Sequence, residues 1–374
     1  MIRCDILIVG AGIAGASAGY FLADHGSVCV IEGEDQPGYH TTGRSAAFFV
    51  ESYGNAHIRP LTRASKALFL APPEGFTDTP LLRERGALYI ARADQRARLE
   101  RFATELAGTV AGLVRRTADQ IRAQVPCLRD GYAVAGLYEG QARDIDVHAL
   151  HQGFLTGLRA RGGEIRTGAY LRALTRRQGR WQAETSAGPI TANVVVNAAG
   201  AWGDEVAELA GTAAIGLTPM RRTIIIVPAP TGIETRDWPL VVDVDEQFYF
   251  KPESGHILAS PADETPMAPC DVQPEEIDVA RAVDRLQKAT NLDIPRILRR
   301  WAGLRTFAPD RVPVVGWDRQ VRDFFWFVGQ GGYGMQTAPA MGRLIAGLLV
   351  RGEVPDALAK EAVSAAAYDP VRFS

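Results

Sequence analysis

Three glycines with the spacing of a phosphate-binding turn lie close to the start of the chain. Gly10, Gly12 and Gly15 stand between a short apolar run and a helix-forming stretch. A second apolar run, 28–31, ends at Glu32, roughly 20 residues beyond the glycines, as the dinucleotide fingerprint requires. The glycines permit a tight turn, close approach of the backbone to a pyrophosphate and close packing of helix on strand, and the acid accepts hydrogen bonds from a ribose hydroxyl. This segment therefore predicts a strand, turn and helix that bind a dinucleotide.

The loop after this unit indicates which dinucleotide is bound. A dinucleotide with a large isoalloxazine ring needs a second phosphate clamp, and Thr41, Thr42, Arg44 and Ser45 can supply hydroxyl and guanidinium donors. An ordinary polar loop that caps the next helix is the alternative for these residues. The loop favours FAD over NAD.

Two later segments place small residues directly after apolar strands. The first strand is followed by 197–202, and the second, 324–328, by a loop with four glycines at 329–334 and then a helix. Backbone amides of such a loop and the helix dipole can point at the pyrimidine end of a flavin, where they stabilise negative charge on the reduced ring. A glycine loop that only caps the helix is the alternative. An NAD-only dehydrogenase would leave this loop without a function.

Apolar periodicity predicts the elements around these motifs. Helices are expected from the fingerprint to about Leu22, from about Gly203, and from the glycine loop to about Leu349. Strands are expected at 5–9, 28–31, 194–197 and 324–328, and period-two patterns predict more at 86–91, 222–227, 247–251 and 256–259.

Together these motifs resemble the D-amino-acid oxidase/glycine oxidase family of FAD-dependent oxidoreductases over essentially the whole chain. The likeness rests on the fingerprint and on 40–47, 197–202, 301–305 and 330–336, and it is greatest to the bacterial D-arginine dehydrogenase type. The resemblance implies an α/β fold (α+β overall) in which a Rossmann-like FAD-binding domain is interleaved with a mixed-sheet substrate-binding domain. The FAD-binding domain is expected at 1–45, 140–215 and 300–374, and the substrate-binding domain at 46–139 and 216–299.

The resemblance and the fingerprint together give the residues expected to bind FAD. Binding is expected to be non-covalent, because no cysteine lies near the C-terminal glycine loop, and no metal is expected, because the four cysteines lack metal-ligand spacing. The expected FAD contacts are Gly10, Gly12, Ile13, Ala14, Gly15, Glu32, Gly33, His40, Thr41, Thr42, Gly43, Arg44, Ser45, Ala46, Ala47, Phe48, Leu171, Ala199, Gly200, Trp202, Gly303, Gly331, Gly332, Tyr333, Gly334, Met335 and Gln336.

Oxidation of an α-amino acid at Cα requires a clamp for the carboxylate, and the fork of an arginine matches a carboxylate bidentately. Arg222 and Arg305 fall where the resembling dehydrogenases place substrate-binding arginines. Tyr249 matches a hydroxyl that contacts the carboxylate, and Tyr53 a residue near the amine, while Gly332 would offer a carbonyl to the ammonium. Core packing is the alternative for Tyr249. Neighbouring Arg221 is expected to be a solvated surface residue.

The sequence departs from the arginine-active type at two positions. Those relatives carry a histidine where this chain has Phe48, and a glutamate that pairs with a cationic side chain where it has Ala87. A guanidinium buried without that partner would be costly. The expected pocket wall is apolar, at Phe48, Phe49, Leu240 and Val242. We therefore expect oxidation of a D-amino acid with a neutral or hydrophobic side chain to the imino acid, which then yields a 2-oxo acid and ammonia.

Other functions fit the same motifs. A flavoenzyme of this fold could oxidise a 2-hydroxy acid or a secondary amine such as sarcosine or proline, and a non-catalytic binding protein could retain the fold. The electron acceptor is expected to be quinone-like or oxygen. The 374 residues carry a formal net charge of −2, which gives no reason to expect nucleic acid as a partner. Glycines break the apolar stretch 5–23, so we expect no stable membrane insertion and a cytoplasmic location.

Overall fold

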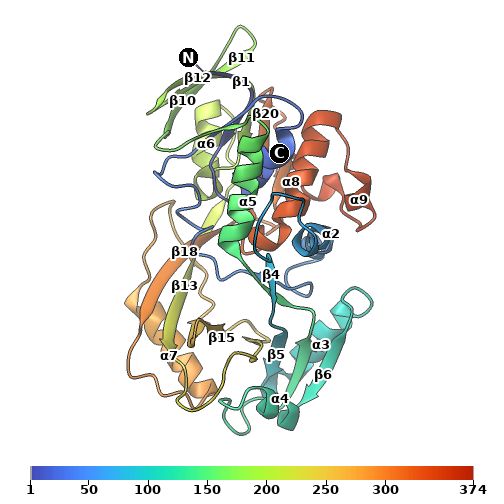
Figure 1. Cartoon of the computed structure of the whole chain (residues 1–374), viewed down its shortest axis with the longest axis vertical. Coiled ribbons are helices and arrows are strands. Elements are labelled where there is room, and N and C mark those ends of the chain that lie inside the picture. Colours follow the sequence, from blue (N-terminus) through green and yellow to red (C-terminus); the bar gives the residue numbers. More distant parts are fainter. Residues whose placement is uncertain (1, 374) are drawn as a thin grey trace.

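The computed structural model describes residues 2–373, whose strands form two large sheets and one small sheet (Figure 1). In the first sheet β1, β2, β9, β12 and β20 run parallel, whereas β10, β11 and β19 pair antiparallel. Its strands are β10 (Leu171–Arg177), β11 (Arg180–Thr185), β12 (Gly188–Asn197), β1 (Ile2–Val9), β2 (Val28–Ile31) and β9 (Glu164–Arg166), with β20 (Phe324–Val328) beside β12 and β19 (Val314–Trp317) beside β20.

The second sheet is mixed, because β5 and β14 run parallel while its other neighbours run antiparallel. Its order is β17 (Thr265–Pro266), β13 (Thr218–Pro228), β16 (His256–Ser260), β15 (Tyr249–Glu253), β14 (Leu240–Asp243), β5 (Ala87–Ala91), β7 (Ala135–Glu139) and β6 (Leu113–Thr117), with β18 (Arg299–Phe307) along the other side of β13. The small sheet joins β3 (Phe48–Phe49), β8 (Arg143–Ile145) and β4 (Leu82–Glu84).

Helices cover both large sheets. In the half with the parallel sheet, α1 (Ile13–Leu22) packs on α5 (Val147–Ala160) and α8 (Gly334–Arg351), and α2 (Ile58–Leu70) packs on α8 and on the short α9 (Asp356–Ala359). On its other side α6 (Gly203–Ala210) lies against β10. In the other half α3 (Arg96–Leu106) and α4 (Ala118–Gln124) contact β7, and α7 (Glu276–Ala289) contacts β13 and β16. Each half thus buries a hydrophobic core of its own.

The predicted fold class is confirmed, and so are the predicted elements. Strands β2 and β20 have the expected bounds, α1 ends at Leu22 and α6 begins at Gly203. The division into two domains at the stated boundaries stays a prediction. The chain crosses between the two large sheets several times. Strand β18, at 299–307, lies in the second sheet.

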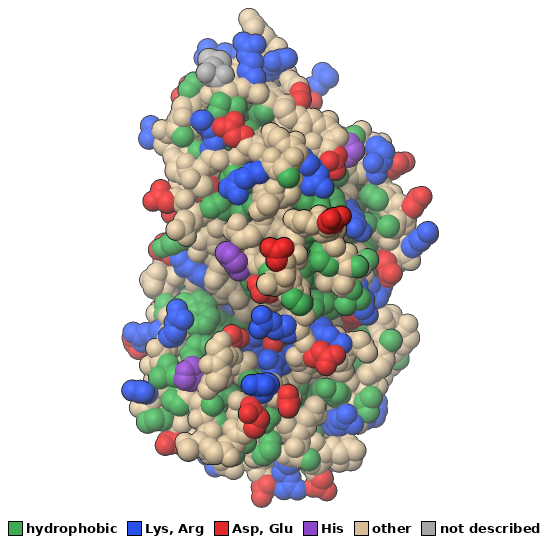
Figure 2. Space-filling view, in the orientation of Figure 1, with side chains coloured by type: hydrophobic (Ala, Val, Ile, Leu, Met, Phe, Trp, Pro, Cys, Tyr) green, Lys and Arg blue, Asp and Glu red, His purple; other side chains and the backbone are tan. Residues whose placement is uncertain are grey.

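The face of the molecule drawn in Figure 2 shows no concentration of one charge. Figure 2 shows acidic and basic side chains interspersed over one face of the molecule, in keeping with the small net charge. Within residues 2–373, no helix combines the length and the apolar character needed to cross a bilayer.

Candidate active site

A cavity of about 380 Å³ lies where the carboxyl ends of the parallel strands meet β18 and the C-terminal glycine loop. The ends of parallel strands are the usual ligand site in such sheets. Every residue that the sequence assigns to cofactor or substrate lines this cavity except four, Gly15, Gly43, Phe49 and Tyr333. The structure thus brings together residues from the two ends and the middle of the chain.

The fingerprint glycines have the backbone that the motif requires. Gly10 has φ of +100°, and a Cβ there would lie 2.6 Å from the carbonyl oxygen of Ala198. Gly15 lies behind the cavity, where a Cβ would be 1.8 Å from the carbonyl oxygen of Gly10, so this glycine allows α1 to pack against the turn. The Glu32 carboxylate lines the cavity and accepts hydrogen bonds from the amides of Ala11 (2.9 Å) and Glu34 (3.1 Å). These amides fix the orientation of the carboxylate, and its contact with a ribose stays a prediction.

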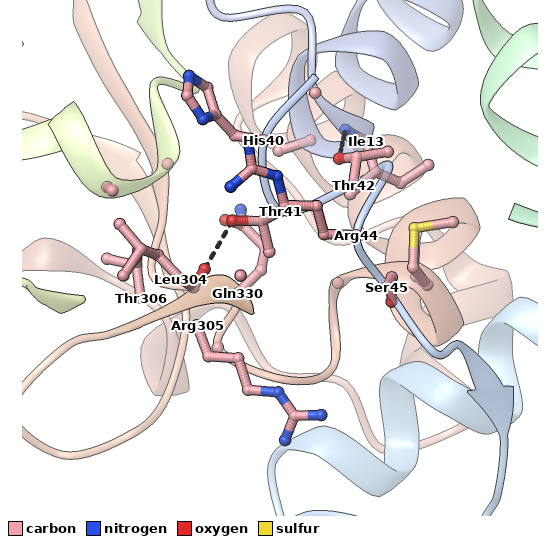
Figure 3. Close-up of a pocket in the computed structure, with 18 of the residues that line it drawn as sticks. Ile13, His40, Thr41, Thr42, Arg44, Ser45, Leu304, Arg305, Thr306 and Gln330 are labelled. Carbon is pink, nitrogen blue, oxygen red and sulfur yellow. Dashed lines mark hydrogen bonds between the residues drawn. The ribbon is translucent and has the colours of Figure 1, made fainter. Parts of the chain in front are cut away.

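The loop after β2 is held by its own polar side chains. Thr42 Oγ1 accepts a hydrogen bond from the amide of Ile13 at 2.9 Å, and Thr41 Oγ1 donates to the carbonyl of Leu304 at 2.6 Å (Figure 3). Gly43, which does not line the cavity, closes the loop through its amide, which donates to Gly38. Thr42 therefore caps the fingerprint helix, while Thr41 ties the loop to β18.

Arg44 is also engaged by protein groups. Its Nη1 donates to the carbonyls of Val272 (2.9 Å) and Ala302 (3.3 Å), and its Nη2 pairs with Asp271. Since these donors and that of Thr41 bond to protein oxygens, a phosphate contact for either side chain stays a prediction. The structure instead shows both side chains connecting the two halves of the molecule.

At the other end of the cavity, the guanidinium of Arg305 has no carboxylate partner among the described residues. Arg305 Nη1 donates to the hydroxyl of Tyr53 at 3.1 Å, and within residues 2–373 this guanidinium forms no ion pair. Burial opposes its charge, yet the surrounding groups raise the pKa of Arg305 above its ordinary value, with Tyr53 and Tyr249 foremost. A Cβ at Gly332 would lie 2.9 Å from Arg305 Nη1 and 3.0 Å from Tyr53 Oη. A side chain here would have to displace the end of Arg305, so the glycine loop lies directly on the arginine.

Tyr249 carries a second unsatisfied group. Its ring is buried and lines the cavity, and its hydroxyl has no hydrogen-bond partner in the part of the chain that the structure describes. A buried hydroxyl without a partner is costly, so it indicates a ligand. Tyr333, outside the cavity, supports the site from behind, with its ring 4.9 Å from that of Tyr53.

Arg222 differs from Arg305 in having its own carboxylate. It is 7% exposed, its Nε donates to the carbonyl of Asp263 at 2.9 Å, and its Nη2 lies 3.1 Å from Glu264. Glu264 also pairs with Arg311 at 2.8 Å. Arg222 lines the cavity with its charge balanced, so the predicted clamp falls mainly on Arg305.

Two predictions about neighbouring side chains were wrong, and for one reason. Arg221 is buried, 2% exposed, and pairs with Asp278 and Glu275 instead of facing solvent. Phe49 is buried away from the cavity against Phe69, whereas Phe48 lines it. Successive side chains in a strand point to opposite faces, so each pair divides between the two sides of its strand.

The part of the cavity that holds Arg305 is called the substrate end below. The wall predicted there for the substrate side chain is apolar, with one acidic exception. Phe48, Leu240 and Val242 line it as predicted. The buried Ala87 does not reach the cavity. Glu246, an exposed residue in the loop between β14 and β15 with φ of +55°, also lines it and was not predicted.

Most other lining residues were missed because their positions carry no motif, whereas Gln330 lies in the motif 330–336 and was given no role. Tyr89 lies within the predicted strand at 86–91, so the period-two pattern there could have identified it. The others include Glu34, Tyr170, Glu205, Ile224, Thr306 and Gln330. Most of these reach the cavity through pairings between distant segments.

The comparisons with known proteins agree with this geometry. The model of the FAD dependent oxidoreductase family matches residues 5–348, so the chain belongs to this family. FAD is accordingly its cofactor. The cavity fits that group, since it joins the fingerprint and Glu32 at one end to the unpaired Arg305 at the other.

Individual relatives are distant. The human mitochondrial dimethylglycine dehydrogenase is 24% identical over 94% of this chain and 43% of its own length, so the chain spans less than half of that relative. Among solved structures, the L-proline dehydrogenase of P. horikoshii is similar with a TM-score of 0.85 at 21% identity, and the glycine oxidase of Geobacillus kaustophilus with 0.83 at 22%, each covering 100% of this chain and 98% of the other. The narrower likeness to D-arginine dehydrogenases finds no support among these relatives.

Proposed function

We propose that this chain oxidises an α-amino acid with a neutral side chain, the D-enantiomer being the one that the sequence resemblance implies. The observation that carries the proposal is the pairing of two unsatisfied groups, the cation of Arg305 and the hydroxyl of Tyr249, on one cavity wall. A carboxylate completes both, because it supplies the missing charge and a hydrogen-bond acceptor.

In this proposal Arg305 and Tyr249 hold the substrate carboxylate while Tyr53 and Gly332 lie beside the amine. When bound, FAD accepts the hydride that leaves Cα. One amine proton is released, the Cα–N bond becomes an imine, and water then converts the imino acid to a 2-oxo acid and ammonia. The electron acceptor that would complete the reaction is quinone-like or oxygen. The tyrosines also separate the clamp from water, which strengthens the arginine–carboxylate attraction.

The wall residues favour a neutral side chain. Phe48, Ile224, Leu240 and Val242 line the substrate end, and they offer an apolar surface. The carboxylate of Glu246 lies on an exposed loop, where water screens it. Burying a guanidinium or ammonium among these side chains would cost more than the exposed acid returns.

A secondary amine is the second candidate. L-proline is a secondary amine and dimethylglycine a tertiary amine, so two relatives are named for amino acids whose nitrogen carries more than one carbon. The same carboxylate clamp would hold such a substrate, and the oxidation would then produce an imine on nitrogen. The 2-hydroxy acid reading has no comparable support among these relatives.

The test is anaerobic titration of the purified holoenzyme, followed by the flavin absorbance. D-Leu, D-Met, D-Phe and D-Arg, their L-enantiomers, sarcosine, L-proline and a 2-hydroxy acid form the panel. Bleaching by neutral D-amino acids, faster than by D-Arg, supports the proposal. Bleaching by sarcosine or proline alone moves the function to secondary amines. Faster bleaching by D-Arg, or by the hydroxy acid alone, contradicts it.

A further inference from the structure

A buried carboxylate lies beneath the substrate end of the cavity without lining it. Glu139, the last residue of β7, is 1% exposed. Its Oε1 accepts a hydrogen bond from the amide of Glu51 at 2.8 Å, and its Oε2 accepts from the amide of Ser52 at 3.2 Å and from the Ser52 hydroxyl. Burial raises the pKa of Glu139, and these three donors oppose that rise. The acid thus stabilises the backbone of the loop that follows β3.

The same acid reaches the cavity wall through a second residue. The hydroxyl of Ser52 lies 2.9 Å from that of Tyr89, which lines the cavity. Because the single Ser52 hydrogen is directed at Glu139, Tyr89 must donate its own hydrogen to Ser52. The bonds therefore run in one direction, from Tyr89 through Ser52 to Glu139, and they fix the orientation of the Tyr89 hydroxyl. The ring of Tyr89 is held separately, 4.8 Å from that of Phe102.

This loop carries a residue of the proposed substrate site. Tyr53 follows Ser52 directly, and its hydroxyl meets Arg305. The loop has two further anchors: the amide of Val50 donates to Gln336 Oε1 at 3.3 Å, and the half-exposed Lys66 pairs with the Glu51 carboxylate at 2.7 Å, but neither supplies an acceptor to the amides of Glu51 and Ser52. Without the Glu139 carboxylate, two buried amides would lack acceptors, and the loop would shift to satisfy them.

We propose that Glu139 is a positioning residue for substrate binding, which holds Tyr53 against Arg305 and orients Tyr89 in the cavity wall. This inference rests on the proposed function, because it concerns the same site. Glu139 touches neither the cavity nor the residues that hold the carboxylate, so its effect passes through the loop. Glu139 thus lies behind the side chains that face the substrate and fixes their positions.

The first experiment replaces Glu139 with Gln in the holoenzyme. A glutamine keeps the shape but turns one acceptor into an NH₂ group that faces the donors of Ser52. We expect KM to rise by about tenfold or more, as expected for a lost hydrogen bond to a charged group, while kcat changes less and the flavin remains bound. The matched control is Glu100→Gln, an exposed acid bonded to Arg115, which should leave both constants unchanged. An unchanged KM in folded E139Q overturns the proposal, even if its melting temperature falls.

A double-mutant cycle keeps the proposal testable if E139Q does not fold. Ser52→Ala removes the link between Tyr89 and Glu139 but leaves both backbone bonds in place. We expect S52A and Tyr89→Phe each to raise KM, and the double variant to be no worse than S52A alone. Fully additive effects overturn the coupling. The wild-type titration is read first: if no compound of the panel bleaches it, the proposed function fails, whereas normal wild-type bleaching with an unaffected variant refutes only the role of Glu139.

Discussion

At the scale of single residues, the site distinguishes two arginines that the sequence treats alike. Arg222 and Arg305 both match family positions, but only Arg222 has a carboxylate, Glu264, at 3.1 Å. That partner lies 42 positions away in sequence, directly before β17, whose pairing with β13 no local pattern reveals. The folded structure, and not the sequence, therefore shows which of the two arginines is free to bind a carboxylate.

This difference predicts opposite behaviour for two matched substitutions. Arg305→Met removes the carboxylate clamp but breaks only one protein hydrogen bond, so we expect KM to rise by about a hundredfold or more with little loss of stability. Arg222→Met leaves Glu264 with Arg311 alone and should lower the free energy of unfolding by about 1–3 kcal/mol. Steady-state kinetics and denaturant melts of both variants check this. A normal KM in R305M would remove Arg305 from the site.

Sequence patterns show only local relations, and this explains which residues the sequence predicted correctly. Motif residues such as Glu32, Tyr249 and Gly332 line the cavity, because glycine spacing and family motifs fix them locally. Arg221 and Phe49 were misplaced, because the sequence shows that a strand alternates but not which face meets the core. Composition alone cannot settle that choice in strands that are buried on both faces.

At the scale of elements, local signals predicted some of the helices and strands, and a few of their boundaries. Strand β20 and the end of α1 coincide with the predicted positions, since glycines and apolar runs mark them. Among the strands that the sequence did not predict are the three short ones of the small sheet. They are two or three residues long, too short for a periodic pattern, and they exist only because β8 pairs with both distant partners.

One contact between elements predicts a pH dependence of stability. His151, buried on α5, bonds through Nε2 to the carbonyl of Ala11 in the fingerprint turn at 2.9 Å. Burial lowers the pKa of His151 below its ordinary value of 6.5. The native state thus keeps the ring neutral while the unfolded chain protonates it, so the unfolded state binds more protons below pH 6.5. This stabilisation is complete above that pH and is lost as the pH falls toward the lowered native pKa.

Replacing His151 should remove this part of the pH dependence. We expect His151→Gln to flatten the loss of melting temperature between pH 7.5 and the acid side of the window, compared with wild type. His256→Gln, at an exposed position on β16, is the control and should follow the wild-type curve. Parallel curves for wild type and H151Q would show that the ring does not titrate on unfolding.

At the scale of the whole molecule, the loop that follows β2 connects the two halves around the cofactor. Thr41 bonds to Leu304 in β18, and Arg44 bonds to Ala302 in the same strand and to Val272. The sequence presented these side chains as phosphate donors, because it showed their chemistry without their partners. The structure gives them a second task, which is to hold the second sheet against the dinucleotide-binding turn.

The two roles of Arg44 make different predictions for Arg44→Met. If Arg44 connects the halves, the variant should melt at a lower temperature than wild type even without FAD, because the carbonyls of Val272 and Ala302 lose their donor. If it served only to bind phosphate, the two apoproteins would melt together and only the FAD-dependent increase would shrink. That increase follows the ratio of FAD to its Kd, about 2.7 kcal/mol at a hundredfold excess. Asp271→Asn, which removes only an exposed ion-pair partner, is the control and should cost about 1 kcal/mol or less. Calorimetry of both apoproteins with and without added FAD separates the outcomes. Equal apoprotein melting temperatures would mean that Arg44 acts only in binding the cofactor.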